Sequence, residues 1–169
     1  MNPLVFHKCV SRDVCKHLSL MRENDETGAR LVTLTAIAES GLREIDQRTG
    51  PGDATLGPAY GLFQIEPATW FDLKDNWLRY RPARSFALHD MLAKEPNVVT
   101  QLATNLWFGA GVCRLIYFRQ EEPLPGMDDL SGLAHYWKQH YNTYKGKGAV
   151  EGFIEKTKAA FDLLRGEIA

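Results

Sequence analysis

The chain has 169 residues, of which 44% are hydrophobic and 24% are charged, so it is long enough for one well-buried core and short for two. Its 20 basic and 21 acidic residues nearly cancel, which excludes the strongly basic surface of a typical nucleic-acid-binding protein. No stretch approaches the roughly 18 apolar residues that a membrane-spanning helix requires. We therefore expect a single domain over residues 1–169, with no nucleic-acid partner and no membrane partner.

The N-terminal segment predicts a helix and no export signal. Residues 1–8 contain no long apolar run and no small-residue cleavage site, so we expect no signal peptide. Ser11 is a suitable N-cap for a helix that continues to about Met21. We place the N-terminal helical segment at residues 1–26.

The cysteines give no sign of a disulfide framework or a metal site. Cys9, Cys15 and Cys113 are an odd number, which indicates at least one unpaired thiol and a reducing compartment. Cys9 and Cys15 lie near His7 and His17, but their spacing is not that of a zinc-binding pair. We expect no metal and no cofactor.

The second helix is expected to be buried over most of its surface. Thr27 or Gly28 opens it, and it ends near Ser40 and Gly41, where glycine can form the C-cap. Its apolar residues occupy more than one stripe, which is typical of a helix packed on several sides. They are Leu31, Val32, Leu34, Ala36, Ile37 and Ala38.

Glu39 lies in the last turn of this helix. The helix dipole is negative there and disfavours a carboxylate, and apolar neighbours add a desolvation cost of the same sign. Both effects raise the pKa of Glu39. A carboxyl group that keeps its proton near neutral pH can act as a general acid, so Glu39 is a candidate catalytic residue.

A long connection and a tight turn follow Glu39. Residues 43–60 lack periodicity and contain Gly-Pro pairs, so we expect a loop with room for a small β-hairpin. Gly61 permits a tight turn after Tyr60. Gln64 is flanked by apolar residues, which places it near a buried surface. Its amide then needs hydrogen-bond partners, and a polysaccharide could supply one.

The rest of the chain predicts a mainly α fold around a central hydrophobic helix. The segments are a short helix from Pro67 toward Trp77, a basic loop over 79–85, the hydrophobic helix from Val98 to about Phe118, a helix from Asp128 or Asp129 to Tyr141, and a last helix over 149–166. Gly109 and Gly111 within the hydrophobic helix imply close packing or a kink. Residues 27–144 then form a core between the two terminal helical segments.

Four short motifs resemble those of the lytic transglycosylases with a lysozyme-like fold, and they occur in the order of that family. The first is Glu39-Ser40, the second is residues 61–69 (Gly-Leu-Phe-Gln-Ile-Glu-Pro-Ala-Thr) and the third is Tyr141-Asn142. The remaining motif, residues 105–109 (Asn-Leu-Trp-Phe-Gly), lies between the second and the third. The resemblance implies a lysozyme-like α+β fold.

The chain departs from the family pattern at several positions. Phe63 stands where methionine is usual, and Pro58 where glycine is usual. Gln64 follows Glu39 by 25 residues (64 − 39), which implies an enlarged loop. Thr143-Tyr144 replaces the Ala-Gly that usually follows the Tyr-Asn pair.

The resemblance implies a peptidoglycan-cleaving enzyme. Glu39 would act as acid and then base on the β-1,4 bond between N-acetylmuramic acid and N-acetylglucosamine, giving a 1,6-anhydro sugar without water. The residues expected around the sugar are Ser40, Tyr60, Gln64, Tyr141 and Asn142. Ser40 could instead cap its helix. Without a signal peptide, we expect a bacteriophage protein that is carried in the virion or released to act in the host periplasm.

Two other functions remain open from the sequence. A hydrolytic lysozyme would need a second carboxylate, for which Asp46 and Asp53 are candidates, although both also fit ordinary turns. A wall-binding or structural virion protein of the same fold, without turnover, is favoured by the altered third motif at Thr143-Tyr144.

Overall fold

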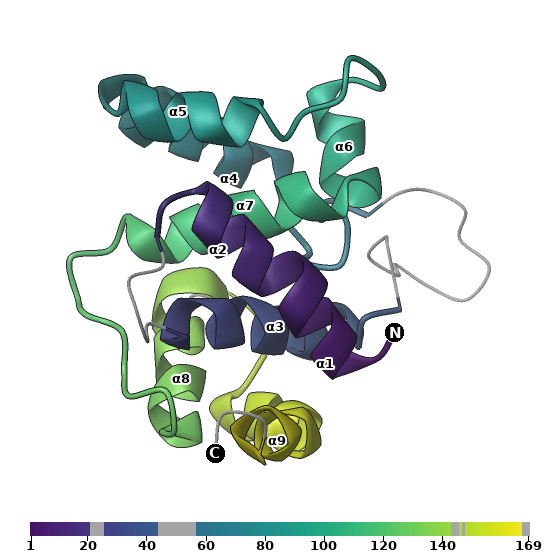
Figure 1. Cartoon of the computed structure of the whole chain (residues 1–169), viewed down its shortest axis with the longest axis vertical. Coiled ribbons are helices and arrows are strands. Elements are labelled where there is room, and N and C mark those ends of the chain that lie inside the picture. The colour runs from purple at the N-terminus through teal and green to yellow at the C-terminus, as the bar shows by residue number, and fades with distance from the viewer. Residues whose placement is uncertain (21–25, 44–56, 143–145, 147, 167–169) are drawn as a thin grey trace.

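The computed structural model describes residues 1–20, 26–43, 57–142, 146 and 148–166, and these are mainly helical, as predicted (Figure 1). The described residues contain no β-strand. Tyr60 and Ile65 form one isolated antiparallel bridge. The hairpin expected within 43–60 falls mostly on residues 44–56, which lie outside the described residues.

The N-terminal helix begins earlier than predicted. It runs through α1 (Pro3–Phe6), the π-helical η1 (His7–Arg12) and α2 (Asp13–His17). Asn2 is its N-cap, because its side chain accepts a hydrogen bond from the backbone N–H of Leu4. Ser11 is therefore not a cap: it is buried in mid-helix, where its hydroxyl accepts a hydrogen bond from Thr33.

The buried helix α3 (Thr27–Ser40) has the predicted bounds. Almost every side chain along it is buried, which agrees with apolar residues on more than one face. It ends at Gly41, whose φ of 62° is the left-handed conformation that a helix C-cap favours.

The following helices differ from the sequence prediction in one segment. As expected, Pro67 begins a helix that reaches Trp77, through α4 (Pro67–Asp72) and the π-helical η2 (Leu73–Trp77). The basic segment 79–85, predicted as a loop, is instead helical. It forms part of the 3₁₀ turn η3 (Leu78–Tyr80) and of α5 (Pro82–His89). Pro82 at the first position of α5 favours this helix start.

The hydrophobic helix predicted from Val98 to Phe118 is two helices. They are α6 (Val98–Thr104) and α7 (Leu106–Phe118), and the chain is extended at Asn105 between them. Asn105 ends the first helix because its side chain caps the second one, accepting a hydrogen bond from the backbone N–H of Phe108.

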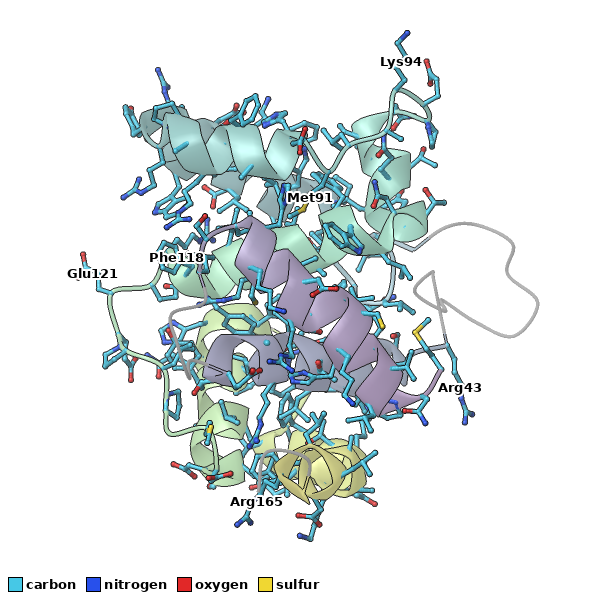
Figure 2. All side chains as sticks on the ribbon, viewed as in Figure 1. Arg43, Met91, Lys94, Phe118, Glu121 and Arg165 are labelled. Atoms are coloured by element: carbon cyan, nitrogen blue, oxygen red, sulfur yellow. The ribbon has the colours of Figure 1, made fainter. Side chains whose placement is uncertain are left out.

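Close packing explains the glycines of α7, as predicted. A Cβ on Gly109 would lie 3.2 Å from the Phe63 ring, and one on Gly111 would lie 2.7 Å from the side chain of Leu88. Met91 also packs over Gly111. In Figure 2 the Met91 side chain lies between the upper helices and α7, whereas Lys94 points away from the protein.

The last helices cover the other side of the core. They are α8 (Leu130–Trp137), capped by Asp129, the π-helical η4 (Lys138–Asn142) and α9 (Val150–Gly166). Helix α7 contacts α5 and α6 on one side and α3 and η4 on the other. In Figure 1, α4, α5 and α6 accordingly lie above α7, and α3, α8 and α9 lie below it. Helices α3, α8 and α9 contact one another, and Glu39 lies among them.

Candidate active site

Glu39 lies in the last turn of α3 with its side chain half-buried. Trp137 of α8 holds one of its oxygens: the indole Nε1 donates a hydrogen bond to Oε1 at 2.8 Å. The other oxygen, Oε2, makes no hydrogen bond with any residue that the structure describes. The hydrogen bond from Trp137 therefore fixes the orientation of the carboxyl group.

The surroundings of Glu39 raise its pKa above the ordinary value of 4.5. Burial is the largest cause, because it disfavours the charged form. The hydrogen bond from Trp137 and the positive charge of Lys156 on α9 act in the opposite direction and only partly offset it. The Lys156 amine is held nearby, since it donates a hydrogen bond to the carbonyl oxygen of Ala38 at 2.8 Å.

The Trp137 side chain is itself held in place by the core. It is only 3% exposed, and its ring centroid lies 4.9 Å from that of Phe153 on α9. We did not identify Trp137 as a site residue from the sequence. The available signal was that a buried indole N–H needs an acceptor. Glu39 supplies this acceptor.

A layer of buried polar side chains lies within electrostatic range of Glu39. The hydroxyl groups of Thr35 and Tyr117 are 2.7 Å apart, and the Tyr117 ring stacks on Tyr141 at 5.3 Å between centroids. Burial raises the pKa of Tyr117, Tyr141 and Cys113 well above their ordinary values, and the Glu39 charge adds to each increase. These groups stay neutral near pH 7, so Glu39 is the group among them that can carry charge.

The second motif forms the tight turn that we expected after Tyr60. Backbone hydrogen bonds join Tyr60 and Ile65 in both directions, each at 3.0 Å. Gly61 has a φ of 74°, and a Cβ there would collide with the carbonyl oxygen of Leu102. Only glycine satisfies both conditions. The turn is thereby held against the end of α6.

Gln64 is half-buried in this turn with a φ of 48°. Its side-chain amide donates a hydrogen bond to the carbonyl oxygen of Gly61 at 2.8 Å. The turn thus satisfies part of the hydrogen-bonding capacity of the Gln64 amide and orients its remaining polar groups. The neighbouring Phe63 is 1% exposed and belongs to the core.

Tyr141 joins the second and third motifs. Its hydroxyl group donates a hydrogen bond to the carbonyl oxygen of Phe63 at 2.7 Å, across 78 positions of the chain. The structure therefore joins Tyr141 to the turn at 61–64, and Tyr141 also lies within electrostatic range of Glu39.

Three other predicted residues have different surroundings. Ser40 is buried, and its hydroxyl donates a hydrogen bond to the carbonyl oxygen of Ala36, one turn earlier in α3. Tyr60 is half-buried against the core. Asn142 accepts a hydrogen bond from the Lys138 amine at 2.8 Å. Thr143 and Tyr144, where the chain departs from the family's third motif, lie outside the described residues. Asp46 and Asp53, the candidate second carboxylates, also lie outside the described residues.

Neither a metal-binding cluster nor a membrane-spanning helix occurs among the described residues. No group of three or more His, Cys, Asp or Glu side chains among them could hold a metal ion. None of the helices described is both long and apolar enough to cross a membrane. The three cysteines, all within the described ranges, form no disulfide.

No protein-family model, no curated protein and no solved structure matches the chain. The residues and geometry around Glu39 are consequently the basis for a functional proposal.

Proposed function

We propose that the protein is a peptidoglycan-cleaving lytic transglycosylase of lysozyme-like α+β fold, with Glu39 as acid and base. One observation carries the proposal. The half-buried Glu39 has a raised pKa, one oxygen fixed by Trp137 and the other without a partner among the described residues. A general acid needs this combination, because it must keep its proton and present it to the substrate.

The reaction needs a single carboxyl group. Glu39 gives its proton to the glycosidic oxygen as the bond from that oxygen to C1 of N-acetylmuramic acid breaks. The N-acetyl group of the same sugar stabilises the positive charge that develops at C1. The Glu39 carboxylate then takes the proton of the 6-hydroxyl group, whose oxygen bonds to C1. The product is a 1,6-anhydro sugar and no water is consumed, unlike the two-carboxylate reactions of most glycosidases.

The turn at 61–64 and Tyr141 position the sugar relative to Glu39. The hydrogen bond from Tyr141 to the Phe63 carbonyl fixes the turn, and the turn fixes Gln64. Side chains that hold a substrate in register with a catalytic group contribute to rate through orientation. Tyr60 and Asn142 flank these two segments and complete the proposed sugar-contacting set. Ser40, also expected around the sugar, donates its hydroxyl hydrogen bond to the carbonyl oxygen of Ala36 at the end of α3.

The proposed partner is peptidoglycan, so the protein must act where the wall is accessible. Carriage in a bacteriophage particle, or release into the host periplasm, provides this access. Other virion proteins would then be its partners. Both routes follow from the resemblance at the four motifs and from the need to reach the wall.

The decisive experiment is digestion of purified Gram-negative peptidoglycan by the wild type and Glu39→Gln, with mass spectrometry of the released muropeptides. The amide keeps the size of the side chain and can still accept the Trp137 hydrogen bond. We expect anhydro-muropeptides from the wild type and a rate lower by about 100-fold to 10,000-fold in the variant. Glu66→Gln is the matched control, because Glu66 is exposed and its side chain caps no helix.

The products also separate the competing functions. Muropeptides heavier by one water would identify a hydrolytic lysozyme and direct attention to Asp46 and Asp53. No release by the folded wild type would overturn the enzymatic proposal in favour of a non-catalytic wall-binding or structural virion protein. Equal release by the wild type and Glu39→Gln would remove Glu39 from the mechanism.

A further inference from the structure

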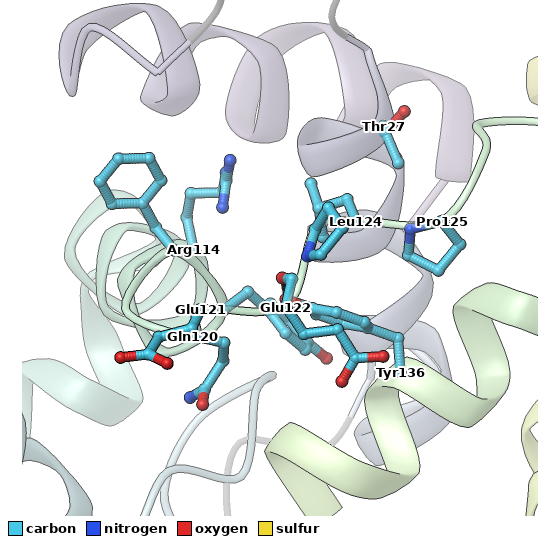
Figure 3. Close-up of a pocket in the computed structure, with 11 residues that line it drawn as sticks. Thr27, Arg114, Gln120, Glu121, Glu122, Leu124, Pro125 and Tyr136 are labelled. Atoms are coloured by element: carbon cyan, nitrogen blue, oxygen red, sulfur yellow. Dashed lines mark hydrogen bonds between the residues drawn. The ribbon is translucent and has the colours of Figure 1, made fainter.

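A pocket of about 420 Å³ lies where the start of α3, the second half of α7 and the segment after α7 meet (Figure 3). Its position is separate from Glu39. Thr27 lines the pocket, and the twelve positions from Thr27 to Glu39 (39 − 27) correspond to about 18 Å along α3. The pocket is therefore independent of the reaction proposed for Glu39.

Arg114 of α7 lines this pocket as a buried cation that has a cation–π contact with Phe118 but no hydrogen-bond acceptor among the described residues. Only 4% of the residue is exposed, and its Nε and Nη1 atoms are buried without a hydrogen-bond partner. The third nitrogen, Nη2, is not fully buried and makes no hydrogen bond with the described residues. The guanidinium group fits here because Gly28 has no Cβ: a Cβ would lie 2.6 Å from Nε.

Arg30 shows how the same fold satisfies a buried arginine. Arg30 is 1% exposed, and it donates hydrogen bonds to the carbonyl oxygens of Met127 and Leu164 and to the Asp128 carboxylate. Arg114 has no comparable acceptor in the part of the chain that the structure describes. A buried charge without an acceptor is costly, so an acceptor supplied from outside the protein would be stabilising.

The two acidic side chains that also line the pocket are not this acceptor. Glu122 Oε2 accepts a hydrogen bond from Gln139 at 2.8 Å and pairs with His140 at 3.0 Å. Glu121 is exposed. In Figure 3 the carboxylate groups of Glu121 and Glu122 point in directions different from the Arg114 guanidinium group.

The rest of the lining is apolar only in part. The apolar part is formed by the ring of Phe118, whose centroid is 5.5 Å from the Arg114 guanidinium carbon, and by Pro123, Leu124 and Pro125, and the polar residues beside it are Thr27, Tyr117, Gln120 and Tyr136. An arginine at one end of an apolar wall suits a ligand with one negative group and a hydrophobic body. An inorganic anion would use only the arginine.

We propose that this pocket binds a small organic carboxylate. The carboxylate accepts a charge-assisted hydrogen bond from Nη2 of Arg114 and balances the charge that the buried Nε and Nη1 share. The hydrophobic body of the ligand packs against Leu124 and the neighbouring prolines. A volume of about 420 Å³ lies within the range of small-molecule sites.

The test is calorimetric titration of the full chain with three probes. They are N-acetyl-L-leucine, which has both features, its uncharged amide N-acetyl-L-leucinamide, and inorganic phosphate. We expect N-acetyl-L-leucine to bind and the other two probes not to bind. The affinity for N-acetyl-L-leucine should fall about tenfold or more in Arg114→Met. The matched control is Arg119→Met, which removes the same charge from the residue that follows α7. Arg119 does not line the pocket and pairs instead with Asp72 at 2.6 Å.

A second variant keeps the test decisive if Arg114→Met fails to fold. Leu124→Glu places a negative charge in the apolar wall and should also abolish binding of N-acetyl-L-leucine. The proposal is overturned if N-acetyl-L-leucine does not bind, if the amide binds equally well, or if phosphate binds in its place. It is also overturned if binding survives unchanged in both pocket variants.

Discussion

Trp137 and Glu39 are 98 positions apart in the chain, yet the indole N–H of one donates a hydrogen bond to the carboxyl group of the other at 2.8 Å. The contact joins the last turn of α3 to the last residue of α8. The pKa of Glu39 is therefore subject to two opposing effects. Burial favours its protonated form, whereas the indole N–H stabilises the carboxylate, and burial is the larger of the two.

Replacing Trp137 by phenylalanine should raise the pKa of Glu39 further. The variant keeps an aromatic ring but loses the donor that stabilises the carboxylate. In peptidoglycan digestion, the alkaline limb of the pH–rate profile should move to higher pH than in the wild type. The free energy of unfolding should fall by about 1–2 kcal/mol from the lost hydrogen bond and packing. An alkaline limb that stays in place would show that Trp137 does not influence the ionisation of Glu39.

Glu39→Gln should be more stable than the wild type at neutral pH. Because the pKa of Glu39 is higher in the folded protein than in the unfolded chain, the folded protein binds more protons. The contribution of Glu39 to stability is then complete below the ordinary pKa of 4.5 and is lost as pH rises through the folded value. Glutamine has no such dependence.

Urea denaturation at pH 7 and at about pH 4 measures this effect. The advantage of Glu39→Gln over the wild type should be present at pH 7 and shrink toward zero at the lower pH. Glu66→Gln, at an exposed position, should show no such difference. An advantage of Glu39→Gln that is independent of pH would contradict the raised pKa.

Local sequence patterns predicted the elements whose signals lie within a few residues. The bounds of α3 followed from its apolar faces and from Gly41, and the start of the Pro67 helix followed from proline at its first position. The break at Asn105 was missed, because an asparagine inside an apolar helical pattern resembles a tolerated interior residue until its capping bond to Phe108 is seen. Ser11 was mistaken for a cap because serine suits both a cap and a buried bond to Thr33.

The candidate site was only partly predictable for a related reason. Glu39 and Gln64 were recognisable from motifs in which neighbouring residues carry the signal. The hydrogen bonds that organise the site, from Trp137 to Glu39 and from Tyr141 to Phe63, span 98 and 78 positions. Such contacts are set by how α8 and η4 pack against α3 and the turn. No periodicity along the chain encodes this packing.

Gly61→Ala should destabilise the protein by about 2–3 kcal/mol. Alanine would be strained at a φ of 74°, and its Cβ would collide with the carbonyl oxygen of Leu102. Thermal or urea denaturation measures the loss. The matched control is Gly152→Ala in α9, where a Cβ meets nothing within 4 Å. That variant should be unchanged or more stable by up to about 1 kcal/mol. Equal stability of both variants would mean that the turn does not pack against α6 as described.

Tyr141→Phe should separate positioning from stability. The variant keeps the ring that stacks on Tyr117 but loses the hydrogen bond to the Phe63 carbonyl oxygen. We expect a loss of about 1–2 kcal/mol in the free energy of unfolding. A loosened turn at 61–64 should also lower kcat for peptidoglycan by about tenfold to 100-fold, because small displacements of a bound substrate are costly.

Tyr136→Phe is the control for the Tyr141 variant, since Tyr136 likewise donates a hydrogen bond to a main-chain carbonyl, that of Glu122, at 2.8 Å. Its stability loss should be similar, with kcat unchanged, because this bond holds the segment after α7 and not the turn at 61–64. If the two variants lose activity equally, kcat follows overall stability and Tyr141 has no positioning role. If only Tyr141→Phe loses activity, the bond between the second and third motifs contributes to substrate orientation.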